Sequence, residues 1–155
     1  MTLEERMHND LSSAMRKKDE LVMMTLRMTL AAFHSRSIEK KGKGEDTVLS
    51  DEEATSIVTR EVKKRKESAE AFLKGGRADL GEKEMKECAI LEAYIPAQVD
   101  DATLEKEVDA VIQKTAPEGM KDFGKVMSVA TKSLKGRADG TRIATCVRKK
   151  LASEA

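Results

Sequence analysis

Aromatic residues, proline and cysteine are all scarce in this chain of 155 residues. It contains no Trp, one Tyr, three Phe, two Pro and two Cys. Ala, Leu, Met, Glu and Lys are abundant instead, and these residues favour helices over strands. The composition therefore predicts an all-α fold, and the length suffices for one domain or two small ones.

Long apolar runs are absent as well. Met1 to Arg6 lacks the apolar stretch of a secretory signal, and no later window approaches the roughly 20 apolar residues of a membrane span. We therefore expect a cytoplasmic protein with no membrane partner. Cys88 and Cys146 lie alone in helical patterns, which excludes a CxxC pair and favours buried thiols over redox chemistry.

Residue patterns typical of catalysis are also missing. His8 and His34 lie in separate helical patterns without an HxxxH or HExxH partner, and no glycine pattern follows a strand to bind a nucleotide. The serines form no nucleophile elbow. Carboxylates alternate with Lys and Arg on polar faces, where pairing keeps them ionised. The sequence predicts no catalytic residue, no metal site and no cofactor, and favours a binding protein.

Helix starts are marked along the first two thirds of the chain. Thr2 and Ser50 each precede a Glu by three residues, the spacing of a capping box, while Asp19 and Asp79 are candidate N-caps. Residues 40–46 are rich in Lys and Gly and are expected to form a mobile loop, either solvated or in contact with phosphate. We predict an N-terminal helical domain over residues 1–96.

In two helices of this domain, the residue pattern predicts which side chains are exposed and which are buried. In the helix that begins after Ser50, the basic residues are expected largely on the outside, namely Arg60, Lys63, Lys64, Arg65 and Lys66. In the next helix, we expect Met85, Ala89 and Ile90 to be buried and the charged residues, Glu87 among them, to be exposed.

Pro96 predicts a domain boundary because it disfavours helix at the residue before it. Beyond it, Asp100, Asp122 and the turn at Asp139 precede three apolar-periodic segments. Residues 97–155 are therefore predicted to form a small three-helix bundle. The last 35 residues carry nine Lys or Arg against three Asp or Glu, whereas the preceding residues carry 20 against 25. This asymmetry is typical of an end that faces a polyanion.

Several motifs resemble those of the GatB/YqeY family. They are Phe72 to Leu80 with Glu84, Glu87, Ile90-Leu91 and Tyr94-Ile95-Pro96, then Phe123 to Met127 and Lys135 to Gly140, and at the start Lys18-Asp19 with Leu26-Arg27-Met28. The resemblance spans nearly the whole chain. It covers only the tail of the larger B subunit of glutamine-dependent aminoacyl-tRNA amidotransferases, and nothing here resembles the catalytic cradle of that subunit.

The resemblance implies an N-terminal helical domain followed by a three-helix domain that grips the outer body of tRNA. In that family, carbon–nitrogen ligase chemistry with glutamine as donor belongs to other subunits, so no intrinsic catalysis is expected. We accordingly expect a tRNA-binding accessory protein of translation, with components of an amidotransferase or of an aminoacyl-tRNA synthetase as further candidate partners.

The candidate RNA contacts are basic residues and glycines of the last two helices and the turn between them. Lysines seven residues apart share a helix face, and glycine lets a backbone approach a partner closely. The alternative is that Asp139 caps the last helix, the glycines fix a tight corner, and the cations form an ordinary solvated face. The predicted contacts are Lys125, Lys132, Lys135, Gly136, Arg137, Gly140, Arg142, Lys149 and Lys150.

A second hypothesis is a helical adaptor that binds a protein and has no RNA role. Methionine side chains adapt to partner surfaces, although filling the core is their expected role here. The methionines concerned are Met15, Met23, Met24, Met28, Met85, Met120 and Met127.

Overall fold

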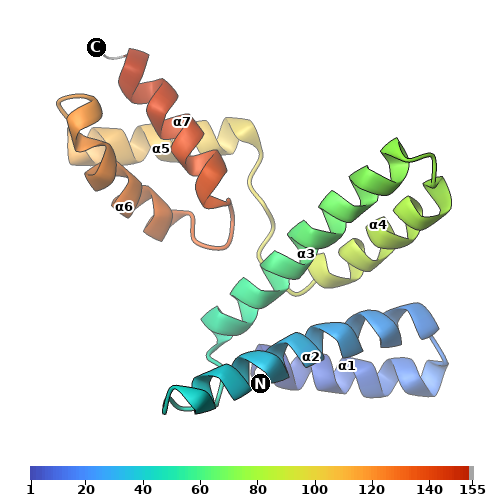
Figure 1. Cartoon of the computed structure of the whole chain (residues 1–155). Coiled ribbons are helices and arrows are strands. Elements are labelled where there is room, and N and C mark those ends of the chain that lie inside the picture. Colours follow the sequence, from blue (N-terminus) through green and yellow to red (C-terminus); the bar gives the residue numbers. More distant parts are fainter. Residues whose placement is uncertain (154–155) are drawn as a thin grey trace. The chain divides into compact units, whose positions relative to one another are not determined.

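The computed structural model describes residues 1–153, and every regular element in this range is helical. Seven α-helices and one short 3-10 helix follow one another, with no strand among these residues (Figure 1). The predicted all-α fold is confirmed. None of the helices within residues 1–153 combines the length and apolar character needed to cross a bilayer. The chain divides into two compact units, Met1–Ile95 and Pro96–Ala155.

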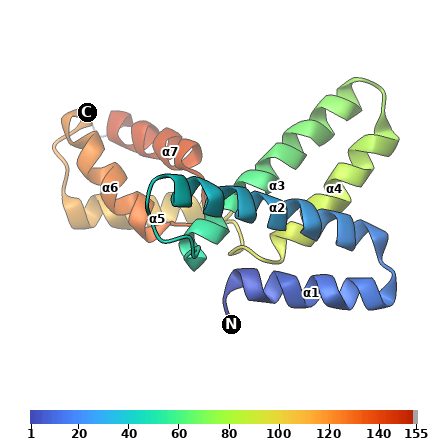
Figure 2. The same ribbon diagram turned by 60° about the horizontal axis from the view of Figure 1, so that its bottom comes forward.

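The N-terminal unit is built from two helical hairpins. Helices α1 (Leu3–Lys17) and α2 (Glu20–Gly42) form the first, and α3 (Asp51–Lys74) and α4 (Ala78–Glu92) form the second (Figures 1 and 2). Apolar side chains of all four helices meet between the hairpins and exclude water, which stabilises the unit. Its largest fully buried side chains are those of Met7, Leu26, Phe33, Val58 and Leu91.

The predicted caps hold at three of four helix starts in this unit. Thr2 and Ser50 form complete capping boxes with their glutamates, and the Asp19 carboxylate accepts a hydrogen bond from the Val22 N–H. Asp79 does not cap α4. That helix begins at Ala78, and the Asp79 carboxylate accepts hydrogen bonds from the Arg77 side chain instead. An acidic residue in the first turn is still favoured by the helix dipole.

The segment predicted as a mobile loop is partly helical. Helix α2 continues to Gly42, and Lys40 is only 8% exposed. Its Nζ donates to the Val48 carbonyl at 3.0 Å and to Glu53 Oε2 at 2.8 Å. The prediction was wrong for residues 40–42, because a lysine can bury its aliphatic stem while its ammonium group reaches a carboxylate on another helix.

Glu53 therefore has two roles, since it completes the capping box of α3 and receives the ammonium group of Lys40. Two hydrogen bonds lower the pKa of the Glu53 carboxyl. The one from Lys40 has the larger effect, and the one from the Ser50 N–H has the next largest. A lowered folded-state pKa contributes stability that is present above the unfolded-state pKa and is lost as the pH falls through the folded value.

Acidification should consequently lower the free energy of unfolding of the wild-type protein more than that of a Glu53→Gln variant, which has no carboxylate at this position to protonate. Urea unfolding midpoints measured between about pH 6 and about pH 3 should converge for the two proteins. Glu67→Gln, at an exposed position, serves as the control. Parallel curves for wild type and Glu53→Gln over this range would contradict the prediction.

Helix α4 presents a different face to the core from the one predicted. Of the three residues predicted to be buried, Ile90 packs partly buried against the core, but Met85 and Ala89 are exposed; Cys88 and Leu91 are buried instead. Glu87, expected on the wet face, is only 5% exposed, and Arg65 of α3, expected outside, is 6% exposed. These predictions were wrong because the two charged side chains neutralise each other inside the unit, which apolar periodicity cannot indicate.

The C-terminal unit contains α5 (Asp101–Thr115), the short 3-10 helix η1 (Met120–Asp122), α6 (Phe123–Ser133) and α7 (Gly140–Ser153). Asp100 caps α5 as expected, and hydrogen bonds from Thr103 lower the pKa of its carboxyl. The three α-helices enclose a separate apolar core, whose fully buried members are Val108, Val126, Ala130, Leu134, Ile143, Val147 and Leu151.

Candidate functional site

The predicted basic residues of the C-terminal unit fall into two groups. Lys125 and Lys132 of α6 and Lys149 of α7 are exposed, and no carboxylate of the described residues lies within ion-pair distance of them. Lys135, just after α6, is exposed as well but has an interaction partner, so it belongs to neither group. The other group is held by carboxylates of the same unit.

Arg137 forms the most complete of these pairs. Its Nη1 and Nη2 donate to Glu107 Oε1 and Oε2 of α5 at 2.8 and 2.7 Å, and Nη2 also donates to the Ser133 carbonyl at 3.0 Å. This fork-to-fork geometry is the strong form of an arginine–carboxylate interaction. Arg137 thus holds the turn that follows α6 against helix α5.

Arg142 and Lys150 of α7 also pair with α5. Arg142 Nη2 donates to the Val99 carbonyl at 2.9 Å and to Asp101 Oδ1 at 3.0 Å. Lys150 Nζ lies 3.2 Å from the Asp109 carboxylate, and the hydrogen bond to Asp109 raises the pKa of the Lys150 ammonium. The carboxylates of α5 therefore offset part of the charge of the basic end.

The turn before α7 has the structural role that was the alternative to phosphate contact. Asp139 Oδ1 accepts a hydrogen bond from the Arg142 N–H at 2.9 Å, so Asp139 caps the last helix. Gly136 adopts a φ of +76°, which favours glycine, and its carbonyl accepts a hydrogen bond from Gln98. Gly140 opens α7, and a Cβ added there would meet nothing within 4 Å.

A buried charged cluster joins α3 to α4 in the N-terminal unit. Arg65 Nη1 donates to Glu87 Oε2 and lies 3.7 Å from Glu84, while Lys83 Nζ lies 3.9 Å from Glu87. Arg65 Nη2 also lies 3.9 Å from the sulfur of Met28 on α2. Two glutamates of the family motif thus have a defined contact, which the sequence motif alone did not assign.

The first part of that motif, Phe72 to Leu80, includes the turn of the α3–α4 hairpin. Gly76 has a φ of +75°, and the Arg77 N–H donates to the Phe72 carbonyl at 2.8 Å. A Cβ on Gly81 would lie 3.0 Å from Leu73 Cγ and 3.3 Å from the Ala69 carbonyl oxygen. Glycine at position 81 therefore lets α4 approach α3 closely.

Several methionines expected in the core lie on the surface. Met15, Met24 and Met28 of the first hairpin and Met85 of the second are each about half exposed, as is Met120 of the C-terminal unit. Of the seven methionines considered above, none is fully buried. The core-filling expectation was wrong for these residues, because other side chains fill the cores, Met7 and Phe33 among them.

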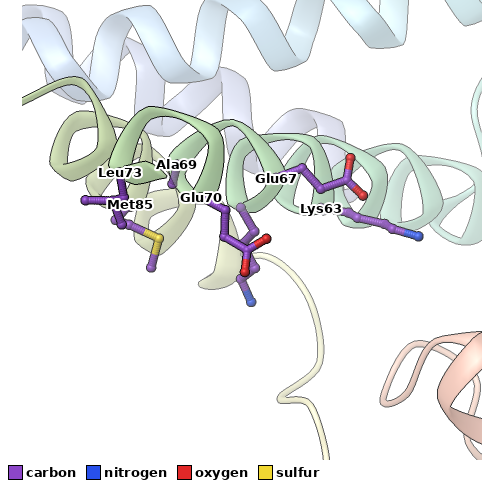
Figure 3. A pocket seen from close by; sticks show the side chains of 7 residues that line it. Lys63, Glu67, Ala69, Glu70, Leu73 and Met85 are labelled. Atoms are coloured by element: carbon purple, nitrogen blue, oxygen red, sulfur yellow. The ribbon is translucent and has the colours of Figure 1, made fainter. Parts of the chain in front are cut away.

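An open groove runs along the α3–α4 hairpin (Figure 3). Leu73 and Met85 lie together at one end of the group of labelled side chains, and Lys63 and Glu67 lie toward the other. The groove has no cluster of nucleophile and base. Its lining consists of Lys63, Lys66, Glu67, Ala69, Glu70, Leu73 and Met85.

The thiols and possible metal ligands show no reactive arrangement within residues 1–153. Burial raises the pKa of both Cys88 and Cys146, which keeps these thiols protonated and weakly nucleophilic at neutral pH. Among the same residues, no three His, Cys, Asp or Glu side chains come together as a metal site.

Comparison with a family model extends the motif evidence. The model described as "Yqey-like protein" matches residues 4–151. The match includes both units and confirms the resemblance to the GatB/YqeY family.

Curated relatives carry a mitochondrial name. Proteins named "Altered inheritance of mitochondria protein 41, mitochondrial" from Lachancea thermotolerans and Eremothecium gossypii are 34% and 35% identical to this chain, over 70% and 57% of it. The alignments cover 55% and 46% of those proteins, so the chain spans about half their length. A protein of the same name from Pyrenophora tritici-repentis is 30% identical over 86% of the chain and 71% of its own length.

These relatives overturn two predictions. A tRNA-binding accessory function and a role in translation were expected, yet the relatives are named for mitochondrial inheritance and not for tRNA binding. The pairing of Arg137, Arg142 and Lys150 inside the bundle gives a physical reason why a basic sequence does not by itself indicate RNA. A cytoplasmic location was also wrong, because the relatives are named as mitochondrial.

The prediction of no intrinsic catalysis is confirmed at the level of the family. Neither the family description nor the name of the relatives is that of an enzyme.

Proposed function

Because the chain belongs to the family of Yqey-like proteins, we propose that it is a non-catalytic accessory protein that acts by binding another protein through its N-terminal unit. The compartment that we propose for this role is the mitochondrion, following the name of its relatives. A component of an amidotransferase or of an aminoacyl-tRNA synthetase is the first candidate partner, as the family resemblance implied.

The observation that supports this proposal is the set of half-exposed methionines of the N-terminal unit. Met15, Met24, Met28 and Met85 expose between 48% and 55% of their surface. A half-exposed methionine forgoes part of the roughly 1.5–3 kcal/mol that full burial of a large apolar side chain provides. Its flexible thioether chain fits partner surfaces of varied shape. Contact with a partner would bury these side chains.

Site-specific photo-crosslinking can test this function. A photoreactive amino acid placed at Met24 or Met28 should give a defined protein adduct in mitochondria that contain the chain, identified by mass spectrometry. The purified partner should then bind the purified chain, and Met24→Glu should weaken binding by introducing a charge into the contact.

The matched control carries the photoreactive residue at Lys17, an exposed cation of α1. Adducts of equal pattern and yield from Lys17 and from the two methionine positions would count against a specific protein-binding surface. Absence of any protein adduct from the N-terminal unit would overturn the proposed function.

A further inference from the structure

The groove of the α3–α4 hairpin has an apolar end and a charged end (Figure 3). Leu73 and Met85 are 54% and 48% exposed at the apolar end, with the buried Ala69 beside them. A Cβ on Gly81 would lie 3.0 Å from Leu73 Cγ, so the Leu73 side chain packs closely against the backbone of α4. A side chain restricted by such packing loses less entropy when a partner covers it.

The charges beside this apolar end leave acidic groups unneutralised. Lys66 Nζ lies 2.6 Å from Glu92 Oε1, so this lysine is already paired. Glu67 and Glu70 are exposed, and no cation of the described residues lies within ion-pair distance of either. Glu82, also exposed, lies three residues before Met85 on the same face of α4. Lys63 also lines the groove and is exposed, but it lies beyond both glutamates, so the unpaired lining charges nearest the apolar end are acidic and favour basic groups there.

The positions along α3 define the spacing of a matching partner. From Leu73, Glu70 lies three residues away and Glu67 six, or about 4.5 and about 9 Å along the helix axis at 1.5 Å per residue. Lys63 lies at about 15 Å and ends the acidic stretch. A partner helix of two to three turns can place an apolar side chain against Leu73 and Met85 and basic side chains beside the two glutamates.

We propose that this groove binds a basic amphipathic helix of the partner protein, with a leucine-like side chain on Leu73 and Met85 and Lys or Arg against Glu67 and Glu70. The inference rests on the proposed function and adds to it the surface and the chemistry of the partner. Charge complementarity favours a partner helix with a positively charged face, and the contact with Leu73 and Met85 sets the position of that helix along the groove.

A synthetic helical peptide of about 18 residues tests the inference, with leucines at positions i, i+3, i+4 and i+7 and lysines beside them. A second peptide has glutamate in place of each lysine. Fluorescence anisotropy should show salt-dependent binding of the basic peptide to the full chain and weaker binding of the acidic peptide. In the wild-type chain, the Met85 methyl resonance should shift on titration and that of Met120 should not.

Charge-swap variants of the chain make the test decisive. Glu67→Lys with Glu70→Lys should weaken binding of the basic peptide roughly fivefold, as expected for two exposed ion pairs, and should strengthen binding of the acidic peptide. Leu73→Ala should weaken the binding of both peptides. The matched control, Glu20→Lys with Glu45→Lys, changes the net charge equally at exposed positions outside the groove.

Equal loss of binding in the control pair would show that net charge alone attracts the peptide, and would overturn the inference. So would binding that leaves the Met85 resonance unchanged, or the absence of binding by the basic peptide. If a partner is crosslinked at Met24 or Met28 while the peptide fails, the protein-binding function stands and only the groove is wrong. If no partner is crosslinked, the proposed function itself fails.

Discussion

Arg65→Ala is expected to lower the free energy of unfolding of the N-terminal unit by about 3–5 kcal/mol, the usual cost of removing one partner of a buried ion pair. Arg65 is 6% exposed and Glu87 is 5% exposed, so the glutamate would stay buried without the guanidinium that now donates to it. Lys83 compensates for Arg65 only in part, because its Nζ lies 3.9 Å from Glu87 and its side chain is half exposed.

A double variant separates the loss of one partner from the removal of the pair. Arg65→Met with Glu87→Leu replaces both charges by apolar side chains and should cost much less than Arg65→Ala, since no buried charge is left unpaired. Urea unfolding followed by circular dichroism measures both. A loss below about 1 kcal/mol for Arg65→Ala would show that water or another group neutralises Glu87.

Most helix starts and the end of α3 could be predicted because they depend on neighbours in the sequence. The capping boxes at Thr2 and Ser50 need only a glutamate three residues later, and the glycines at 75 and 76 end α3 wherever it packs. The all-α class follows from the same local preferences. These features require no knowledge of which helix lies beside which.

The inward faces of the helices could not all be predicted, because they depend on pairs that are distant in sequence. Arg65 and Glu87 are 22 residues apart, and each alone has the character of a surface residue. Lys40 was placed in a loop because its segment is rich in Lys and Gly, and its partner, Glu53, lies 13 residues away. The periodicity of apolar residues does not indicate which charged side chains pair across helices.

The candidate basic site shows the same limit. The sequence predicted which residues carry the charge, but not that Arg137, Arg142 and Lys150 would each find a carboxylate on or beside α5. The partner Glu107 lies 30 residues before Arg137, and Asp101 and Asp109 each lie 41 residues before their partners. A charge count along one segment therefore overstates the charge that a partner meets.

Phe33→Ala should destabilise the N-terminal unit by about 3–5 kcal/mol, the typical cost of removing a buried aromatic side chain. Phe33 on α2 is fully buried in the same core as Leu26 and Leu91. The loss combines the transfer of the ring to water with the cavity that remains, since rigid helices collapse only partly around it. Phe33→Leu keeps much of the volume and should cost less.

Met24→Ala on the same helix provides the comparison that connects stability with function. Met24 is 48% exposed, so its truncation should change the free energy of unfolding by less than about 1 kcal/mol. Urea unfolding of the three variants should therefore rank Phe33→Ala far below Phe33→Leu and Met24→Ala in stability. If Met24→Ala were as damaging as Phe33→Ala, the methionine would be needed for the fold. A small loss instead leaves the Met24 side chain free to contact a partner, because the opposite face of α2 already holds the helix in place.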